Sequence, residues 1–198
     1  MFIQVIESKS TRQDEVRALS RRWVEELSPG ARGWLGGTFG FTEDDRFVGV
    51  VRFESREAAT ANSGRAEQGE WAMQMAKLMD EPARFHDCDE AMTMFDGGSD
   101  SAGFVQVVRG RVGDRAQLEG LMTDTGDLHR MRPEIIGATL GIDADGSFFQ
   151  TVSFTSEESA RASEQQLDMP ADVRDRIEAA MRDVSYLDLR APWFTSPV

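Results

Sequence analysis

Hydrophobic and polar positions follow two spacings along this chain. Segments with apolar residues at every second position predict strands, and segments with apolar residues every three to four positions predict helices. In the first half the pattern predicts a strand, a helix, two strands joined by a turn, further helical structure and a last strand. The predicted strands are residues 2–8, 34–41, 46–53 and 85–88.

The predicted helices of the first half each present one apolar face. These faces consist of Val16, Leu19, Trp23 and Leu27 in the first helix and of Trp71, Met75, Leu78 and Met79 in the last. Ser10 and Gln13 have the spacing of a capping box, which predicts that the first helix begins there. Ser55 is predicted to cap a short helical segment between the two.

The second half of the chain repeats the first in degraded form. Phe2-Ile3-Gln4-Val5-Ile6 returns as Phe104-Val105-Gln106-Val107-Val108, an offset of 102 residues, and the later segment around residues 47–59 returns 101 residues on. Such a duplication predicts two copies of one structural unit. We expect repeat 1 at residues 1–97, a flexible linker at 98–102 and repeat 2 at 103–198.

The element order in each repeat is βαββαβ, the order of ferredoxin-like α+β units. Helices would cover only one face of such a sheet. In the strand at residues 46–53, Phe47, Val51 and Phe53 point one way while Val48 and Val50 point the other, so both faces are apolar. We therefore expect the sheets of the two repeats to pack face to face within one chain, as a pseudo-dimer whose further association stays open.

Composition limits the classes of partner. The formal net charge of -13 disfavours nucleic acid and anionic membrane surfaces as partners. No apolar run approaches the roughly 20 residues that span a bilayer, and the N-terminus does not resemble a signal peptide. Cys88 is the single cysteine, so no internal disulfide forms. These features favour a cytoplasmic protein, and only two lysines among 22 basic residues favour a GC-rich bacterial genome.

Tandem ferredoxin-like units with sheet facing sheet resemble the dimeric α/β barrel superfamily, and within it the antibiotic biosynthesis monooxygenase-like domains. The resemblance is based on element order, on the segment Val50-Val51-Arg52-Phe53-Glu54-Ser55, on Asn62-Ser63 before a helix, and on the duplication. It covers essentially the whole chain. The superfamily includes cofactor-free oxygenases, haem-degrading enzymes, isomerases and proteins without known activity, so the resemblance implies a fold and not one reaction.

The haem-degrading branch of the superfamily has a first-strand asparagine and, in its second helical region, a tryptophan and a histidine. At the aligned positions this chain has Gln4, Asn62 and Trp71. The axial histidine is missing, so the resemblance implies that haem is not a cofactor. We expect no cofactor.

His86 and Cys88 lie on one face of the last predicted strand of repeat 1. They could pack in the core, His86 could line a pocket as a general base, or the pair could bind a metal. Leu187 and Leu189 occupy the matching positions of repeat 2, which favours core packing. We predict no metal site, and His86 is one of two weak catalytic candidates.

Gln4 is the other weak catalytic candidate. Gln4 and Gln106 occupy matching places in otherwise apolar strands. A buried amide needs hydrogen-bond partners, so each glutamine either satisfies a need that both repeats share or contacts a ligand.

A ligand-binding cavity is more readily expected in repeat 1 than in repeat 2. Trp71 and Met75 lie where repeat 2 has Val173 and Ile177, and repeat 1 also contains Trp23 and Trp34. These four residues either form ordinary core or bind a small apolar or aromatic molecule. The first hypothesis for function is such a site, with cofactor-free oxygenation as its enzymatic version. The alternative is a non-catalytic binding or assembly module with a filled pocket.

Two further features have structural explanations. The acidic residues at 43–45 and 143–145 fall in matching hairpin turns, where turn chemistry accounts for them without a calcium site. His129 follows a helix-like run and is typical of a solvated helix C-terminus.

Overall fold

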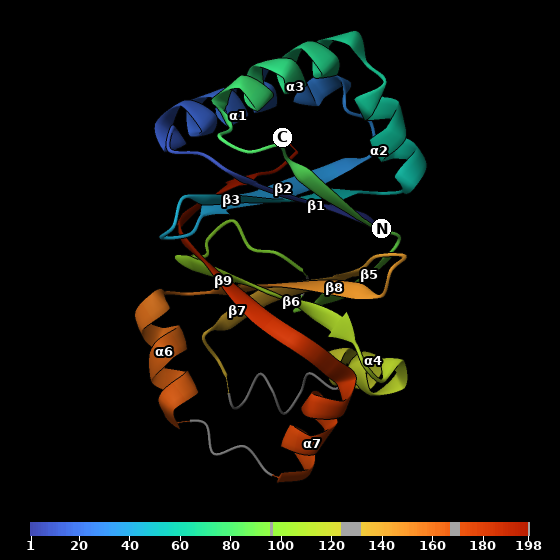
Figure 1. The fold of residues 1–198 in the computed structure, drawn as a ribbon, viewed down its shortest axis with the longest axis vertical. Helices are drawn as coiled ribbons and strands as arrows, with labels where there is room; N and C mark the ends of the chain where they lie inside the picture. Colours follow the sequence, from blue (N-terminus) through green and yellow to red (C-terminus); the bar gives the residue numbers. More distant parts are fainter. Residues whose placement is uncertain (96, 124–131, 167–170, 198) are drawn as a thin grey trace. The chain divides into compact units, whose positions relative to one another are not determined.

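The structure is a computed structural model that describes residues 1–95, 97–123, 132–166 and 171–197 (Figure 1). Within the chain two compact units are distinguished: unit 1 comprises Met1–Glu90 with Arg190–Val198, and unit 2 comprises Ala91–Leu189. His129 lies outside the described residues. No helix in the described part of the chain is long and apolar enough to cross a membrane.

Unit 1 is a ferredoxin-like α+β unit with one added strand. Its sheet is antiparallel throughout and has the strand order β4-β1-β3-β2-β9, with α1, α2 and α3 on one face (Figure 1). The elements are β1 (Phe2–Lys9), α1 (Gln13–Glu26), the 3-10 turn η1 (Ser28–Gly30), β2 (Trp34–Phe41), β3 (Arg46–Phe53), α2 (Arg56–Ser63), α3 (Ala66–Leu78), β4 (Arg84–Cys88) and the C-terminal part of β9 (Met181–Thr195).

Unit 2 has the same plan. Its strand order is β9-β6-β8-β7-β5, so β9 and β5 occupy the two edges. The elements are β5 (Glu90–Met94), β6 (Phe104–Val112), α4 (Arg115–Thr123), β7 (Ile135–Ile142), β8 (Ser147–Phe154), α6 (Glu157–Gln166), α7 (Ala171–Ala180) and the N-terminal part of β9.

The two units differ from the two sequence repeats at their ends. Residues 91–94 follow the last strand of repeat 1 and belong to unit 2, whereas residues 190–198 end repeat 2 and belong to unit 1. Thr195 and Phe194 at the C-terminus pair with Gly37 and Thr38 of β2. Each unit is therefore completed by a strand segment from the other repeat.

The strand predictions are confirmed, whereas the capping box is wrong. β2 and β3 have the bounds expected from the hydrophobic pattern, and Ser55 accepts a hydrogen bond from the Ala58 backbone N–H as the cap of α2. The residue before α1 is Arg12, and it makes no side-chain capping bond. Ser10 Oγ instead accepts from the Arg12 N–H at 3.1 Å and donates to the Leu78 carbonyl at 2.7 Å, because α3 ends beside it.

The matching hairpin turns reach the left-handed region at the same position. Asp45 has φ 63° and Gly146, which lies 101 residues later, has φ 77°. The acidic side chains serve the turns: Asp143 Oδ1 accepts from the Asp145 and Ser147 N–H groups at 3.0 and 2.8 Å. The acidic residues are therefore turn residues, as expected.

Gly146→Ala is expected to destabilise unit 2 by about 1 kcal/mol, because a Cβ in this conformation crowds the following carbonyl. Apart from Gly146 and its two chain neighbours, no described residue has an atom within 4 Å of the added Cβ, so backbone strain is the only new cost. Urea unfolding followed by far-UV circular dichroism measures the effect. An unchanged midpoint would show that the turn relaxes out of this conformation at no cost.

Candidate functional site

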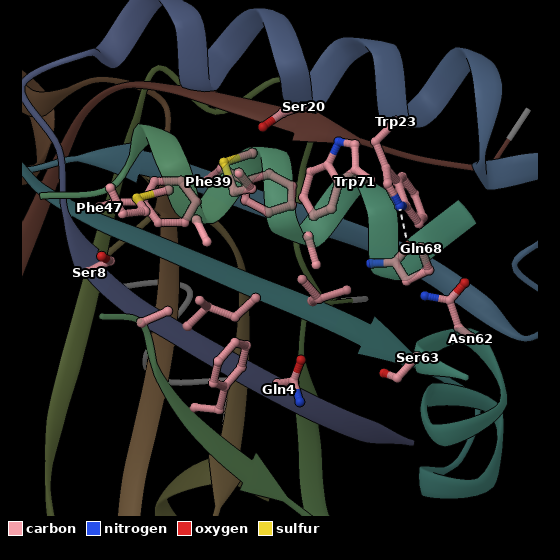
Figure 2. A pocket seen from close by; sticks show the side chains of 18 of the residues that line it. Gln4, Ser8, Ser20, Trp23, Phe39, Phe47, Asn62, Ser63, Gln68 and Trp71 are labelled. Carbon is pink, nitrogen blue, oxygen red and sulfur yellow. Dashed lines mark hydrogen bonds between the residues drawn. The ribbon is translucent and has the colours of Figure 1, made fainter. Parts of the chain in front are cut away.

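A cavity of about 760 Å³ lies inside unit 1, between the sheet and the helices α1, α2 and α3 (Figure 2). Its volume falls within the range of small-molecule sites. Trp23, Trp34, Trp71 and Met75 all line it. The four residues proposed from the sequence as ligand contacts are thus brought together in one wall, and ligand binding by them stays a prediction.

Three tryptophans from three different elements form one side of the cavity. The ring centroids of Trp23 and Trp34 are 4.9 Å apart at 71°, and those of Trp23 and Trp71 are 6.4 Å apart at 63°, both edge-to-face. The Trp71 indole N–H donates to the Leu19 carbonyl at 3.1 Å. These contacts hold the rings in place and leave their remaining apolar surface to the cavity.

The sheet, to which Trp34 belongs as the first residue of β2, adds further aromatic side chains to the cavity wall. Phe39 and Phe47 lie stacked with ring centroids 6.3 Å apart at 17°. A Cβ added to Gly37 or Gly49 would come within 2.5 or 3.0 Å of the Phe39 ring. The Phe39 ring therefore lies over Gly37 and Gly49, where side chains would otherwise stand.

Polar side chains gather at one end of the cavity, where Gln4, Asn62, Ser63 and Gln68 lie (Figure 2). Gln68 Oε1 accepts a hydrogen bond from the Trp23 indole N–H at 2.6 Å. Asn62 Oδ1 accepts from Arg65 Nη1 at 3.0 Å, and the Asn62 side chain is buried. This end can therefore hydrogen-bond a polar group on an otherwise apolar ligand.

Three further polar side chains in the wall are bonded to the protein backbone. Ser8 Oγ donates to the Glu81 carbonyl at 2.7 Å, and Ser20 Oγ donates to the Val16 carbonyl at 2.9 Å. Asp80 accepts from the Thr11 N–H at 2.7 Å, and this bond lowers the pKa of the Asp80 carboxyl. The connection between α3 and β4 is thus fixed to the end of β1.

Phe85 marks where the cavity meets the surface. It lines the cavity and is 59% exposed, although it is a large apolar side chain. Asp80 and Glu81 also line the cavity and are exposed. The solvent-exposed part of the wall therefore includes an aromatic ring and two carboxylates.

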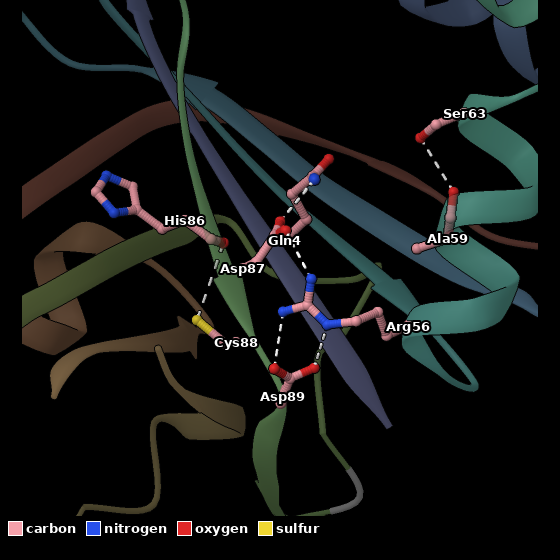
Figure 3. Close-up of polar contacts among 8 residues, drawn as sticks. All are labelled: Gln4, Arg56, Ala59, Ser63, His86, Asp87, Cys88 and Asp89. Atoms are coloured by element: carbon pink, nitrogen blue, oxygen red, sulfur yellow. Dashed lines mark hydrogen bonds and ion pairs between the residues drawn. The ribbon is translucent and has the colours of Figure 1, made fainter. Parts of the chain in front are cut away.

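His86 lies outside the cavity wall. In the β1–β4 ladder Gln4 is opposite Asp87 and Val5 is opposite His86, and side chains alternate between faces, so His86 points to the other face of β4. His86 Nε2 is 3.8 Å from Glu7 Oε1, and Cys88 on the same face is buried (Figure 3). His86 is therefore not one of the residues that line the cavity, and it does not reach a ligand bound there as a general base.

Metal ligands are also sparse. No group of three or more His, Cys, Asp and Glu side chains suited to a metal ion occurs within the described ranges.

Gln4 belongs to a polar network at the edge of the sheet (Figure 3). Gln4 Nε2 donates to Asp87 Oδ1 at 2.8 Å, and Arg56 Nη1 donates to Asp87 Oδ2 at 3.0 Å. Arg56 also binds Asp89 through two bonds of 2.6 and 2.7 Å, which lower the pKa of Asp89 and raise that of Arg56. The half-buried amide group of Gln4, which the sequence left in question, therefore has a carboxylate partner.

The same network recurs in unit 2. Gln106 Nε2 donates to Asp188 Oδ1 at 2.9 Å, and Arg161 pairs with Asp188. Arg56 is the first residue of α2. Its counterpart by the 101-residue offset is Glu157, the first residue of α6, and Arg161 lies one turn after it. The glutamine–aspartate pair thus meets a need that both units share, while Gln4 in addition faces the cavity.

Asn62 and Gln68 are site residues that the sequence reasoning did not single out as ligand contacts. Gln68 lies in phase with Met75 on α3, seven residues apart, so it is a polar residue on an apolar helical stripe. That break in the stripe was the available signal. Asn62 gave no such signal, because it lies in a polar stretch that runs from α2 into α3.

No family model matches the chain, and no curated protein matches it. Solved structures show its fold. The match to a candidate monooxygenase from Lactobacillus acidophilus NCFM covers 100% of this chain and 98% of that protein, at TM-score 0.71 and 11% identity. The match to a candidate monooxygenase from Fusobacterium nucleatum covers 98% of this chain and 94% of that protein, at TM-score 0.71 and 10% identity. The match to an anthrone oxidase-like protein covers 99% of this chain and 94% of that protein, at TM-score 0.58 and 11% identity.

These likenesses extend over the whole chain in both directions, so the tandem α+β architecture is that of monooxygenase-like proteins. At such identities they establish the fold alone.

Proposed function

We propose that the cavity in unit 1 binds an uncharged aromatic molecule with a polar substituent. The observation that carries the proposal is the composition of the wall, in which three tryptophans and several phenylalanines enclose about 760 Å³ and side-chain amides gather at one end. Aromatic walls with a few convergent polar groups are typical of small-molecule sites.

The charge of the wall narrows the ligand class. Of the described residues that line the cavity, none is a lysine, arginine or histidine, and two are the acidic residues Asp80 and Glu81. An organic acid or phosphate ester would lose its hydration there without gaining a cationic partner. The proposed ligand therefore enters as a neutral molecule.

Cofactor-free oxygenation is the enzymatic version of the proposal. Its support is the fold likeness to two candidate monooxygenases and to an anthrone oxidase-like protein. For an aromatic ring system with an acidic CH₂ group, loss of a proton gives a carbanion. Attack of that carbon on O₂, followed by protonation, gives a hydroperoxide. Loss of water then leaves a ketone, so one CH₂ and one O₂ become one C=O and one H₂O.

The residues at the polar end would assist this reaction by binding charge. Asn62 and Gln68 can donate hydrogen bonds to the oxygen on which the charge of the anion is delocalised. Asp87, the carboxylate next to this end, is already bonded to Gln4 and Arg56. The proton of the substrate would therefore leave to water, and the pH dependence of the rate would follow the pKa of the substrate.

Tryptophan fluorescence tests binding directly, because all four tryptophans belong to unit 1 and three of them line the cavity. We expect 2-naphthol to quench the emission with saturation and a Kd in the micromolar range, and 2-naphthoic acid to bind at least tenfold more weakly. Absence of saturable quenching by 2-naphthol up to millimolar concentration would contradict the binding site.

Oxygen uptake separates the enzyme from a binding protein. Anthrone in air without added cofactor is expected to consume one O₂ per anthraquinone formed. Saturable binding without oxygen uptake above the rate in buffer would favour the non-catalytic alternative. The cavity in unit 1 is open, which does not favour a non-catalytic module whose pocket is filled by its own side chains.

A further inference from the structure

The three amide side chains at the polar end of the cavity each have one atom bonded to the protein. Gln4 Nε2 donates to Asp87, Asn62 Oδ1 accepts from Arg65, and Gln68 Oε1 accepts from Trp23. An amide has an acceptor end and a donor end, so fixing one end determines what the other end offers. Gln4 is left with its acceptor oxygen, and Asn62 and Gln68 with their donor nitrogens.

The free ends of these amides point to the same region. In Figure 2 the Gln4 oxygen and the nitrogens of Asn62 and Gln68 are directed into the cavity. Among the described residues, none accepts a hydrogen bond from Asn62 Nδ2 or Gln68 Nε2. The Asn62 side chain is largely buried, at 7% exposure, so its nitrogen gains from a hydrogen-bond partner on a ligand.

The partners that fix the amides are themselves held. Asp87 is bound by Arg56, which Asp89 anchors through two bonds. Arg65 donates to both the Leu27 carbonyl and Asn62 Oδ1 at 3.0 Å. It also packs against Gly30, where an added Cβ would lie 2.4 Å from its guanidinium. An aspartate carboxylate can only accept and an arginine guanidinium can only donate hydrogen bonds. The amides of Gln4 and Asn62 therefore cannot turn over without losing a charge-assisted bond.

We propose that Asp87, Arg65 and Trp23 are positioning residues that give the cavity a fixed pattern of one acceptor and two donors. The matching ligand is an aromatic compound that carries a hydroxyl and a carbonyl group at one end of its ring system. The hydroxyl donates to Gln4, and the carbonyl accepts from Asn62 and Gln68. The inference rests on the proposed binding function and adds the substituents that the ligand must carry.

Repeat 2 supplies a control for this assignment. Its glutamine–aspartate pair, Gln106 and Asp188, has the same donor direction as Gln4 and Asp87. The positions 101 residues after Asn62 and Gln68 hold Ser163 and Met169, neither of which carries an amide. At these aligned positions the three-amide pattern therefore occurs in repeat 1 alone.

The test compares two ligands that differ in one hydrogen-bond donor, 2-naphthol and 2-methoxynaphthalene. Wild-type protein is expected to bind 2-naphthol about tenfold more tightly, the effect of one hydrogen bond of about 1.4 kcal/mol. In Asp87→Asn the new amide can donate to Gln4, which frees Gln4 to turn its own nitrogen toward the cavity. We expect the preference to fall below threefold, measured by isothermal titration calorimetry.

Asp188→Asn is the matched control, because it makes the same change in the network of unit 2 and is expected to keep the tenfold preference. Gln4→Met removes the acceptor at similar volume, leaves the bond between Asp87 and Arg56, and should abolish the preference. It tests the inference even if Asp87→Asn fails to fold. Equal affinity of the wild type for both probes, or equal behaviour of Asp87→Asn and Asp188→Asn, would overturn the inference and leave the binding function intact. Failure of both probes to bind the wild type would overturn the binding function itself.

Discussion

Val51→Trp is expected to lower the affinity of unit 1 for 2-naphthol at least 100-fold while unit 1 remains folded. Val51 lies on β3 opposite Gln4, and its side chain points from the sheet into the cavity. An indole in its place would occupy the space that the ligand needs. Because that space is open, the larger side chain needs no rearrangement of packed neighbours, and we expect the free energy of unfolding to change by less than about 1 kcal/mol.

Val152→Trp is the control for this prediction. Val152 is the repeat 2 counterpart of Val51 and is 8% exposed within a packed cluster that includes Leu118, Leu140 and Phe148. The same enlargement is expected to destabilise unit 2 by about 1–3 kcal/mol, because no space receives it. Titration calorimetry and urea unfolding give the two readouts. Undiminished naphthol binding by Val51→Trp would place the ligand site elsewhere.

Trp193→Ala is expected to destabilise unit 1 by about 3–5 kcal/mol, the usual cost of removing a buried large aromatic side chain. Trp193 is near the end of repeat 2 in the sequence but belongs to unit 1. Its ring lies 5.7 Å from that of Phe39 and 6.2 Å from that of Phe47, and Arg17 lies over it at 4.5 Å. Trp193 therefore packs against Phe39 and Phe47, the sheet residues that line the cavity.

The measurement uses the three remaining tryptophans, all of which are in unit 1 and report its unfolding in urea. Met92 is the counterpart in repeat 1, 101 residues earlier, and packs against the core of unit 2. Met92→Ala should therefore leave the tryptophan transition unchanged and weaken unit 2, which far-UV circular dichroism follows. If Trp193→Ala left the tryptophan transition in place, the assignment of the C-terminal segment to unit 1 would be wrong.

The elements of this protein could be predicted because each one depends on a local pattern. The strand at residues 46–53 alternates apolar residues between two faces, and the structure places Phe47, Val51 and Phe53 in the cavity wall on one of them. The capping box failed for the opposite reason. Ser10 and Gln13 have suitable spacing, but Ser10 bonds to the end of α3, and Gln13 Nε2 donates to Asp45. A tertiary partner replaced the local one.

The site could be predicted only in part. Its aromatic residues were recognisable because repeat 1 is bulkier than repeat 2 at Trp71 and Met75. The imidazole of His86 has the chemistry of a general base, yet the alternation of side chains along β4 directs it to the other face. Which face of a strand bounds a cavity depends on the helices packed over it, and the residue itself does not encode that.

The sequence by itself determined most of the secondary structure, the duplication and the apolar faces, because these depend on periodicity and on residues close together in the chain. Only the tertiary structure decided that the last segment of each repeat completes the other unit, and that Gln4, Asn62 and Gln68 meet at one end of a cavity. Asp87 and Gln4 are 83 positions apart, and their bond sets the direction in which the Gln4 amide points. Such contacts follow from the register of paired strands and the packing of helices on them, which involve residues from the whole length of a unit.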